Sequence, residues 1–150
     1  MKRMVYQVAV GKQSKLYEHC IQSVANYCNK YSMTHIVQRE PILKIRPDMA
    51  RTGRSKEAVE RLGYMPIYEK ENAFTHLGEF EQIAIIDSDI YIRQEAPNIF
   101  WDINEEYAFG AVAERELPCA KKYKSKIRKY SKAAFENIKD LPASNLNTPS

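Results

Sequence analysis

Two carboxylates separated by one residue, Asp87 and Asp89, follow directly on an apolar stretch of the chain. From Gln82 to Ile92 the sequence reads QIAIIDSDIYI, so a run typical of a buried strand leads into Asp87-Ser88-Asp89. Two like charges about 5 Å apart repel by roughly 1 kcal/mol in water and about 3 kcal/mol at an effective dielectric of 20. Water tolerates such a pair, whereas a cleft requires a cation between the carboxylates. The spacing indicates either a solvated turn, in which Asp side chains cap backbone amides, or a cation site.

A strand, a helix and a second strand are predicted at the start of the chain. Residues 4–10 (MVYQVAV) form a mostly apolar run that ends at Gly11, as in a buried first strand. From Ser14 the apolar residues recur at steps of three and four, which predicts one face of an amphipathic helix. Residues 34–38 (THIVQ) predict the second strand, so the order is a βαβ unit with a right-handed crossover. The apolar helix face comprises Leu16, Cys20, Ile21, Val24, Tyr27, Cys28 and Tyr31.

The rest of the chain continues this alternation. Residues 40–55 are polar and irregular, and two helices are then predicted, over residues 55–63 and 66–77, with Ser55 as a candidate N-cap and Gly63 as a stop. After the motif strand we expect a helical turn opened by Pro97, a strand over residues 107–113 and a helix over residues 120–138. These patterns predict a single α/β domain over residues 1–150, with a mainly parallel sheet and helices on both faces.

Two other chemistries that use paired aspartates fit less well. A calcium-binding EF-hand loop is excluded because its sixth and twelfth positions, Gly and Glu, are Ile92 and Asn98 here. A phosphatase of the haloacid dehalogenase type uses an Asp nucleophile after an apolar strand, here Asp87, with a second Asp two residues on. That family usually has Thr or Val where this chain has Tyr91, places its motif on the first strand, and has a downstream acidic pair. This phosphatase remains an alternative.

The segment IAIIDSDIYI resembles the D-x-D motif of glycosyltransferases with the GT-A fold. The surroundings are similar as well: a βαβ start, a Lys-bearing segment in YEKENAFTHLGEFEQIAIIDSD, the turn APNIFWDI and the stretch AFGAVAE. The resemblance covers residues 4–116 and is greatest to family-8-type enzymes. It implies a Rossmann-like sandwich that binds a UDP- or GDP-sugar with Mn²⁺ or Mg²⁺ and transfers the sugar to an unknown glycan, lipid or protein acceptor.

The resemblance also assigns roles to individual residues. Asp89 would bind the metal directly, Asp87 would contact the metal or the ribose, and Ser88 would help to hold the ribose. The end of the first strand, Ala9, Val10 and Gly11, would face the base. Lys70 and Arg54 are candidate contacts for the diphosphate or the base, although a solvated surface charge is the simpler interpretation of each. No residue is assigned as a catalytic base.

A second class of function arises from a basic stretch near the end of the sequence. Seven of the twelve residues from Lys121 to Lys132 (KKYKSKIRKYSK) are Lys or Arg. The pattern fits an amphipathic helix with solvated charges, or a non-catalytic basic module that contacts an anionic membrane surface or nucleic acid. For a glycosyltransferase an anionic lipid or polyanionic acceptor fits better than specific nucleic acid. The chain would then be peripheral to a membrane.

The remaining composition predicts a cytoplasmic protein. No apolar run reaches 18 residues, and the N-terminus lacks the features of a signal peptide. Cys20, Cys28 and Cys119 have no metal-binding spacing, so we expect reduced thiols. Enzymes of the family usually exceed 200 residues, and the acceptor-binding half is therefore expected to be largely missing. A sheet that ends early exposes an edge strand, which predicts either a short transferase that forms a homodimer or a fragment that binds nucleotide without efficient transfer.

Overall fold

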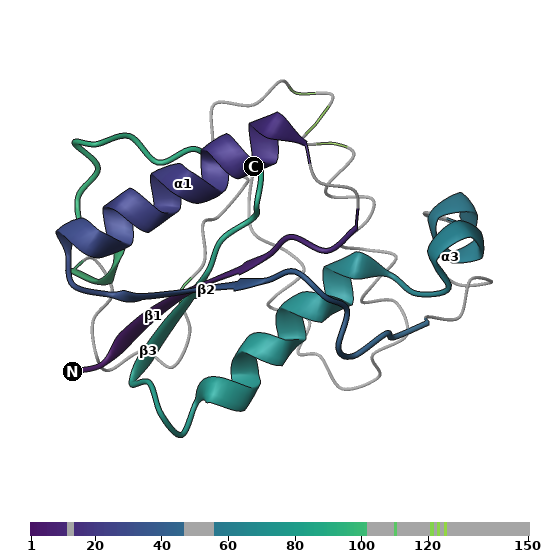
Figure 1. The fold of residues 1–150 in the computed structure, drawn as a ribbon, viewed down its shortest axis with the longest axis horizontal. Coiled ribbons are helices and arrows are strands. Elements are labelled where there is room, and N and C mark those ends of the chain that lie inside the picture. Colours follow the sequence, from purple (N-terminus) through teal and green to yellow (C-terminus); the bar gives the residue numbers. More distant parts are fainter. Residues whose placement is uncertain are drawn as a thin grey trace. The chain divides into compact units, whose positions relative to one another are not determined.

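The elements of the protein alternate between strands and helices in a computed structural model (Figure 1). The structure describes residues 1–11, 14–46, 56–101, 110, 121, 123 and 125. In chain order the elements are β1 (Arg3–Val8), α1 (Lys15–Lys30), β2 (Thr34–Gln38), α3 (Lys56–Leu62), the 3₁₀ helix η1 (Pro66–His76), β3 (Gln82–Ile85) and the short 3₁₀ helix η2 (Ile99–Trp101).

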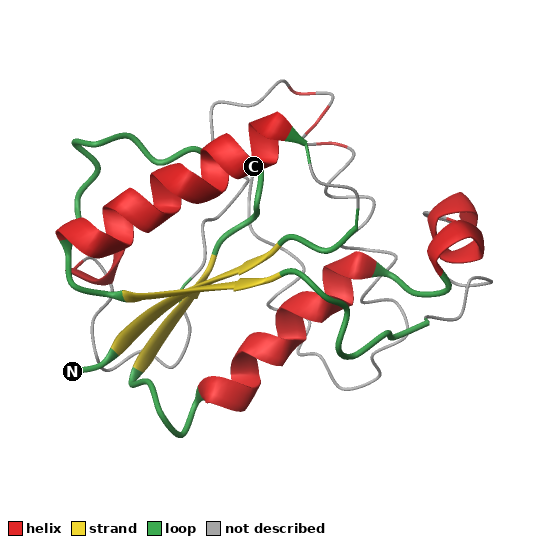
Figure 2. Cartoon of the chain, in the orientation of Figure 1, coloured by secondary structure: helices red, strands yellow, loops and turns green. Residues whose placement is uncertain are grey.

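The three strands form one parallel sheet in the order β2-β1-β3 (Figure 2). In the register, Val5 of β1 lies opposite His35 of β2 and Ala84 of β3. The chain therefore moves from β1 to one neighbour, then crosses back over β1 to reach β3 on its other side. This is a Rossmann-like topology, which confirms the predicted α/β class and parallel sheet. It also places a topological switch point between β1 and β3, where open α/β sheets bind ligands.

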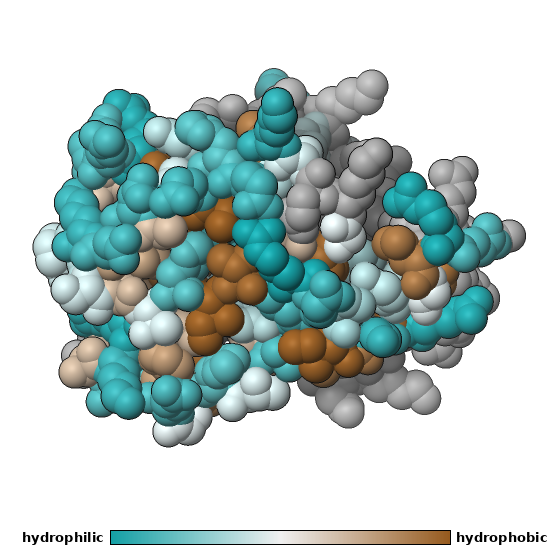
Figure 3. All heavy atoms as spheres, viewed as in Figure 1, coloured by the Kyte–Doolittle hydropathy of each residue, from teal (hydrophilic) through white to brown (hydrophobic). Residues whose placement is uncertain are grey.

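Alternate residues of β1 enter two separate apolar layers. Val5 packs with Val24 and Cys28 of α1, whereas Met4 and Tyr6 pack with Ala73 of η1. The alternation follows from the two-residue period of a strand, and it means that α1 covers one face of the sheet and η1 the other. Apolar side chains also reach the surface in the strip between these two helices, where the sheet lies (Figure 3).

Helix α1 begins where the sequence predicts. The Ser14 hydroxyl accepts a hydrogen bond from the Tyr17 amide at 3.3 Å and so caps the first turn. Leu16 departs from the predicted apolar face, because its side chain is 63% exposed in this first turn. The buried positions begin one turn later, at Cys20. Burial raises the pKa of the Cys28 thiol to about 11, so this buried side chain stays protonated and acts as a packing residue.

The segment predicted as a helix over residues 66–77 is helical, but it coils as a 3₁₀ helix. The Tyr68 amide donates to the Met65 carbonyl at 3.1 Å, three residues back. Side chains three positions apart eclipse each other in this geometry. Glu69 and Asn72 are therefore aligned on one row, and both are buried against the sheet.

A buried polar network joins η1 to the two neighbouring strands. Asn72 Nδ2 donates to the Tyr6 hydroxyl at 2.9 Å, and this hydroxyl donates to Gln38 Oε1. The Gln38 amide nitrogen donates to Glu69 Oε2 at 2.7 Å and to the Glu40 carbonyl at 2.9 Å. Each of these polar side chains has a partner, so the network stabilises the fold instead of leaving unsatisfied groups in the interior.

The Glu69 carboxylate also organises the loop that follows β2. It accepts hydrogen bonds from the backbone amides of Ile42 and Leu43 on Oε2, at 2.7 and 3.1 Å, and from Lys44 on Oε1, at 2.6 Å. Lys44, the last of these three residues, has a left-handed φ of 49°. Burial alone would raise the pKa of Glu69, but the hydrogen bonds outweigh burial and hold the pKa below its usual value. The side chain is thus a buried carboxylate anion.

Several predicted elements lie outside the described residues. The backbone divides into two compact units, Met1–Asn104 and Glu105–Ser150. In the second unit Lys121, Tyr123 and Ser125 are helical. The predicted strand over residues 107–113, apart from Gly110, the rest of the basic stretch and Cys119 fall outside the description. No helix among the described residues is long and apolar enough to cross a membrane. The predictions of a single domain and of a homodimer stay predictions.

We expect the substitution Glu69→Gln to destabilise the protein by about 2–3 kcal/mol at pH 7, because the new amide group faces backbone N–H donors that it cannot satisfy. The folded pKa of Glu69 lies below the ordinary value of 4.5, so its contribution to stability is present above pH 4.5 and is lost as the pH falls through the folded value. The difference between wild type and variant should therefore shrink in acid. Urea unfolding from pH 3 to pH 7 measures this.

Glu71→Gln is the matched control, because Glu71 is exposed on the same helix. Its free energy of unfolding should stay within about 0.5 kcal/mol of the wild type. An equal loss of stability in both variants would contradict the role given to the buried carboxylate.

Candidate functional site

The D-x-D segment lies in a turn at the carboxyl end of β3. The ladder to β1 continues one residue past the strand, as the Ile86 amide donates to the Tyr6 carbonyl at 3.0 Å. The Ile90 amide then donates to the Asp87 carbonyl at 3.1 Å, which closes a four-residue turn. Asp87 and Asp89 are both exposed. The direction of the two carboxylates is therefore set by a turn and not by the pleat of an extended strand.

A buried glutamine fixes the start of this turn. Gln7 is 0% exposed, and its amide nitrogen donates to the Asp87 carbonyl at 3.1 Å. Its amide oxygen lies 2.9 Å from His35 Nε2, and since this oxygen can only accept, the His35 Nε2 carries the proton. Burial lowers the pKa of His35, which favours the neutral ring. Gln7 of β1 thus links His35 of β2 to the start of the D-x-D turn after β3.

Helix α1 holds the chain that leaves the turn. The Ile92 amide donates to the Ser23 hydroxyl at 2.9 Å, and this hydroxyl donates to the Cys20 carbonyl at 2.7 Å. One residue earlier, the Tyr91 ring stacks on His19 with centroids 5.2 Å apart and an interplanar angle of 12°. The turn is therefore fixed on both sides, by the sheet before it and by α1 after it. The role of His19 here is packing against the motif.

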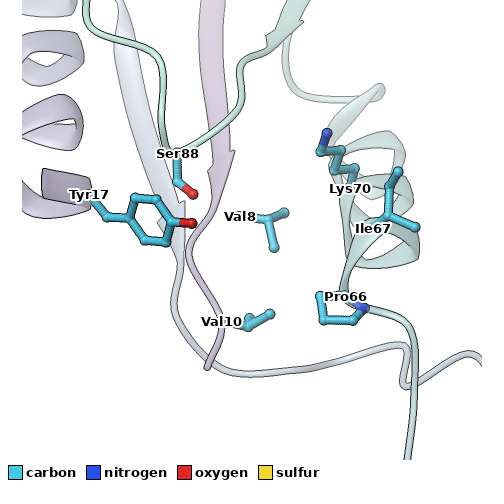
Figure 4. Close-up of a pocket in the computed structure, with 7 residues that line it drawn as sticks. All are labelled: Val8, Val10, Tyr17, Pro66, Ile67, Lys70 and Ser88. Carbon is cyan, nitrogen blue, oxygen red and sulfur yellow. The ribbon is translucent and has the colours of Figure 1, made fainter. Parts of the chain in front are cut away.

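A pocket of about 210 Å³ opens at the switch point between β1 and β3. Tyr17 and Ser88 lie on one side of it, Pro66, Ile67 and Lys70 lie on the other, and Val8 and Val10 lie between them (Figure 4). The lining combines apolar side chains with the polar groups of Tyr17, Lys70 and Ser88, and small-molecule sites usually contain both kinds of group. The D-x-D resemblance names Val10, Lys70 and Ser88 among these residues but not Val8, Tyr17, Pro66 or Ile67. The missed signal is positional, because the first turns of helices next to β1 and β3 must border the switch point.

Lys70 and Asp87 form an ion pair beside this pocket. The Lys70 ammonium group contacts Asp87 Oδ1, with the side chains 33% and 55% exposed. Lys70 directly follows Glu69, whose carboxylate accepts hydrogen bonds from backbone amides of the loop after β2. The predicted Lys thus meets the predicted carboxylate directly. The pair gives the rim of the pocket one positive and one negative group.

The three residues predicted at the end of β1 take different positions. Ala9 is 3% exposed, and its amide donates to the Gln38 carbonyl at 2.8 Å, which continues the pairing with β2. Val10 lines the pocket. Gly11 has a φ of 94°, a conformation that side chains rarely adopt, and it turns the chain away from the sheet. Only Val10 of the three therefore faces the pocket.

The other predicted site residues give less information. Arg54 lies outside the described residues. Within the described part of the chain, no group of three or more His, Cys, Asp or Glu side chains is arranged to hold a metal ion. Asp87 and Asp89 provide two carboxylates, and Mg²⁺ is typically bound by one or two carboxylates together with substrate phosphates and waters. A site of that kind does not need a third protein carboxylate.

Comparisons with known proteins give no relative for this chain. No protein-family model, no curated protein and no solved structure matches it. The functional argument therefore depends on the sequence and on the geometry of the site.

We expect Gln7→Leu to destabilise the protein by about 2–4 kcal/mol, because the Asp87 carbonyl and His35 Nε2 each lose a buried hydrogen-bond partner. Amide hydrogen exchange at Ile90 should become faster, since the D-x-D turn loses its connection to β1. Gln22→Leu on the exposed face of α1 is the matched control and should leave both measurements nearly unchanged. Unchanged exchange at Ile90 in Gln7→Leu would contradict the proposed restraint.

Proposed function

We propose that the protein is a metal-dependent glycosyltransferase of the GT-A type that uses a nucleotide-diphosphate sugar as donor. The observation that supports this most is the position of the pocket. It lies at the switch point of a Rossmann-like sheet, and Val10, Lys70 and Ser88, all named from the D-x-D resemblance, line it together. Asp87 contacts one of these residues directly.

The apolar part of the pocket suits the base of the nucleotide. Tyr17 provides an aromatic ring on one side of the pocket, and Val8, Val10 and Ile67 provide apolar surface in the rest of it. Aromatic rings bind bases by stacking, which contributes about 1–3 kcal/mol per base. In this proposal the base lies against Tyr17 and the ribose lies toward Ser88.

The polar rim suits the diphosphate. Asp87 and Asp89 are exposed carboxylates on one rigid turn, and their oxygen atoms fit Mn²⁺ or Mg²⁺. When bound, such an ion stabilises the negative charge that develops on the nucleotide diphosphate as it leaves the sugar. Lys70 supplies a second positive group for the same diphosphate.

The first test is the stabilisation of the protein by nucleotide. With UDP or GDP at about 100 times the dissociation constant, we expect the free energy of unfolding to rise by about 2.7 kcal/mol in Mn²⁺ and by much less in EDTA. Asp89→Asn should remove the metal-dependent part while leaving the unliganded stability unchanged, because Asp89 is exposed. Thermal unfolding with and without ligand measures both quantities.

Glu79→Gln removes a charge from an exposed position before β3 and is the control. It should keep the full response to nucleotide and Mn²⁺. Equal stabilisation by UDP or GDP in Mn²⁺ and in EDTA would reject the metal site. Hydrolysis of a simple phosphate ester that Asp87→Asn abolishes would instead identify the phosphatase alternative.

The second test concerns the base. We expect Tyr17→Ala to weaken the binding of UDP or GDP by about 5- to 150-fold, the range that loss of one stacking contact predicts. Tyr17→Phe keeps the ring and should bind within about twofold of the wild type. The binding of inorganic pyrophosphate with Mn²⁺ should be unaffected in both variants, as measured by calorimetry. A base that binds equally well to Tyr17→Ala would contradict the proposed orientation.

A further inference from the structure

The ion pair between Lys70 and Asp87 joins two groups to which the proposed function gives opposite partners. Asp87 would bind a divalent cation, and Lys70 would bind the negatively charged diphosphate. In the structure the two side chains bind each other. A cation at Asp87 Oδ1 and the Lys70 ammonium group therefore compete for the same oxygen atom.

The backbone on both sides of this pair is fixed. The Asp87 carbonyl accepts from Gln7 and from the Ile90 amide, so the turn cannot easily move away. Lys70 follows Glu69, which is held by Gln38 and by three backbone amides. Breaking the ion pair is consequently a change of side-chain position, with the two backbones staying in place.

We propose that Lys70 is an internal counter-ion for Asp87 and that it couples the binding of the cation to the binding of the diphosphate. This inference depends on the proposed function for the identity of the two ligands. Either ligand alone weakens the ion pair, because the cation repels the Lys70 ammonium group and the diphosphate repels the Asp87 carboxylate. When both ligands bind, the cation occupies Asp87 and the diphosphate occupies Lys70.

The coupling arises because the ion pair has to be broken only once, by whichever ligand binds first. The free energy of the ion pair is subtracted from the binding free energy of the first ligand. The second ligand binds without this loss. Each ligand should therefore tighten the binding of the other by the same factor, since coupling between two binding sites is reciprocal. The order of addition does not matter at equilibrium, and the cation and the diphosphate bind best together.

The variant Lys70→Met tests the proposal because it removes the counter-ion and keeps the aliphatic chain. Mn²⁺ alone should bind about twofold to fivefold more tightly, the range that an exposed ion pair supplies, and pyrophosphate alone should bind more weakly. The factor by which each ligand tightens the other should fall by a similar twofold to fivefold. Electron paramagnetic resonance of free Mn²⁺ and calorimetry of pyrophosphate measure these constants.

Two further variants complete the design. Asp87→Asn removes the other member, so it should weaken Mn²⁺ binding while pyrophosphate alone binds more tightly to the released Lys70. Lys15→Met makes the same charge change at an exposed position in the first turn of α1 and should behave as the wild type.

The outcomes separate this inference from the proposed function. If UDP or GDP and Mn²⁺ bind together but Lys70→Met binds Mn²⁺ as the wild type does, the counter-ion role is wrong and the proposed function stands. If pyrophosphate and Mn²⁺ are coupled through Lys70 but neither UDP nor GDP binds, the inference stands and the nucleotide assignment fails. Absence of Mn²⁺ binding with and without pyrophosphate overturns both.

Discussion

The buried carboxylate of Glu69 is the interaction on which the arrangement of this α/β unit depends. It is a charged group with 0% exposure, and a charge removed from water is stable only when hydrogen bonds replace its hydration. Here the donors are Gln38 of β2 and the amides of the following loop. One side chain thus holds η1, β2 and an irregular loop in a single arrangement. Because η1 forms one wall of the pocket, the shape of the pocket depends on the same contact.

The sheet and this polar network have complementary roles. The strand order β2-β1-β3 brings the carboxyl ends of β1 and β3 together, and this produces a switch point without reference to any particular ligand. The polar side chains then define the site in detail. Gln7 fixes the D-x-D turn through its hydrogen bond to the Asp87 carbonyl, and Glu69 fixes the backbone beside Lys70. The opposite charges of Lys70 and Asp87 are brought together by these two separate anchors.

The strands, the α-helical cover and the cap at Ser14 could be predicted from the sequence, because each depends on local periodicity or on a single side chain. The 3₁₀ geometry of η1 could not, since it depends on aligning Glu69 and Asn72 with partners on distant strands. Among the residues that line the pocket, the D-x-D resemblance names Val10, Lys70 and Ser88, whereas Tyr17 had no sequence signal beyond its place in a first helical turn.

The tight coil of η1 also restricts how this sequence can change. A 3₁₀ helix advances about 120° and 2.0 Å per residue, against about 100° and 1.5 Å in an α-helix. Conversion of η1 to an α-helix would rotate Asn72 by about 60° relative to Glu69 and shorten the segment by roughly 5 Å. One polar side chain would then leave its partners, or Pro66 would withdraw from the pocket wall. Substitutions that merely raise α-helical propensity in this segment would therefore be selected against, even where the side chain itself is exposed.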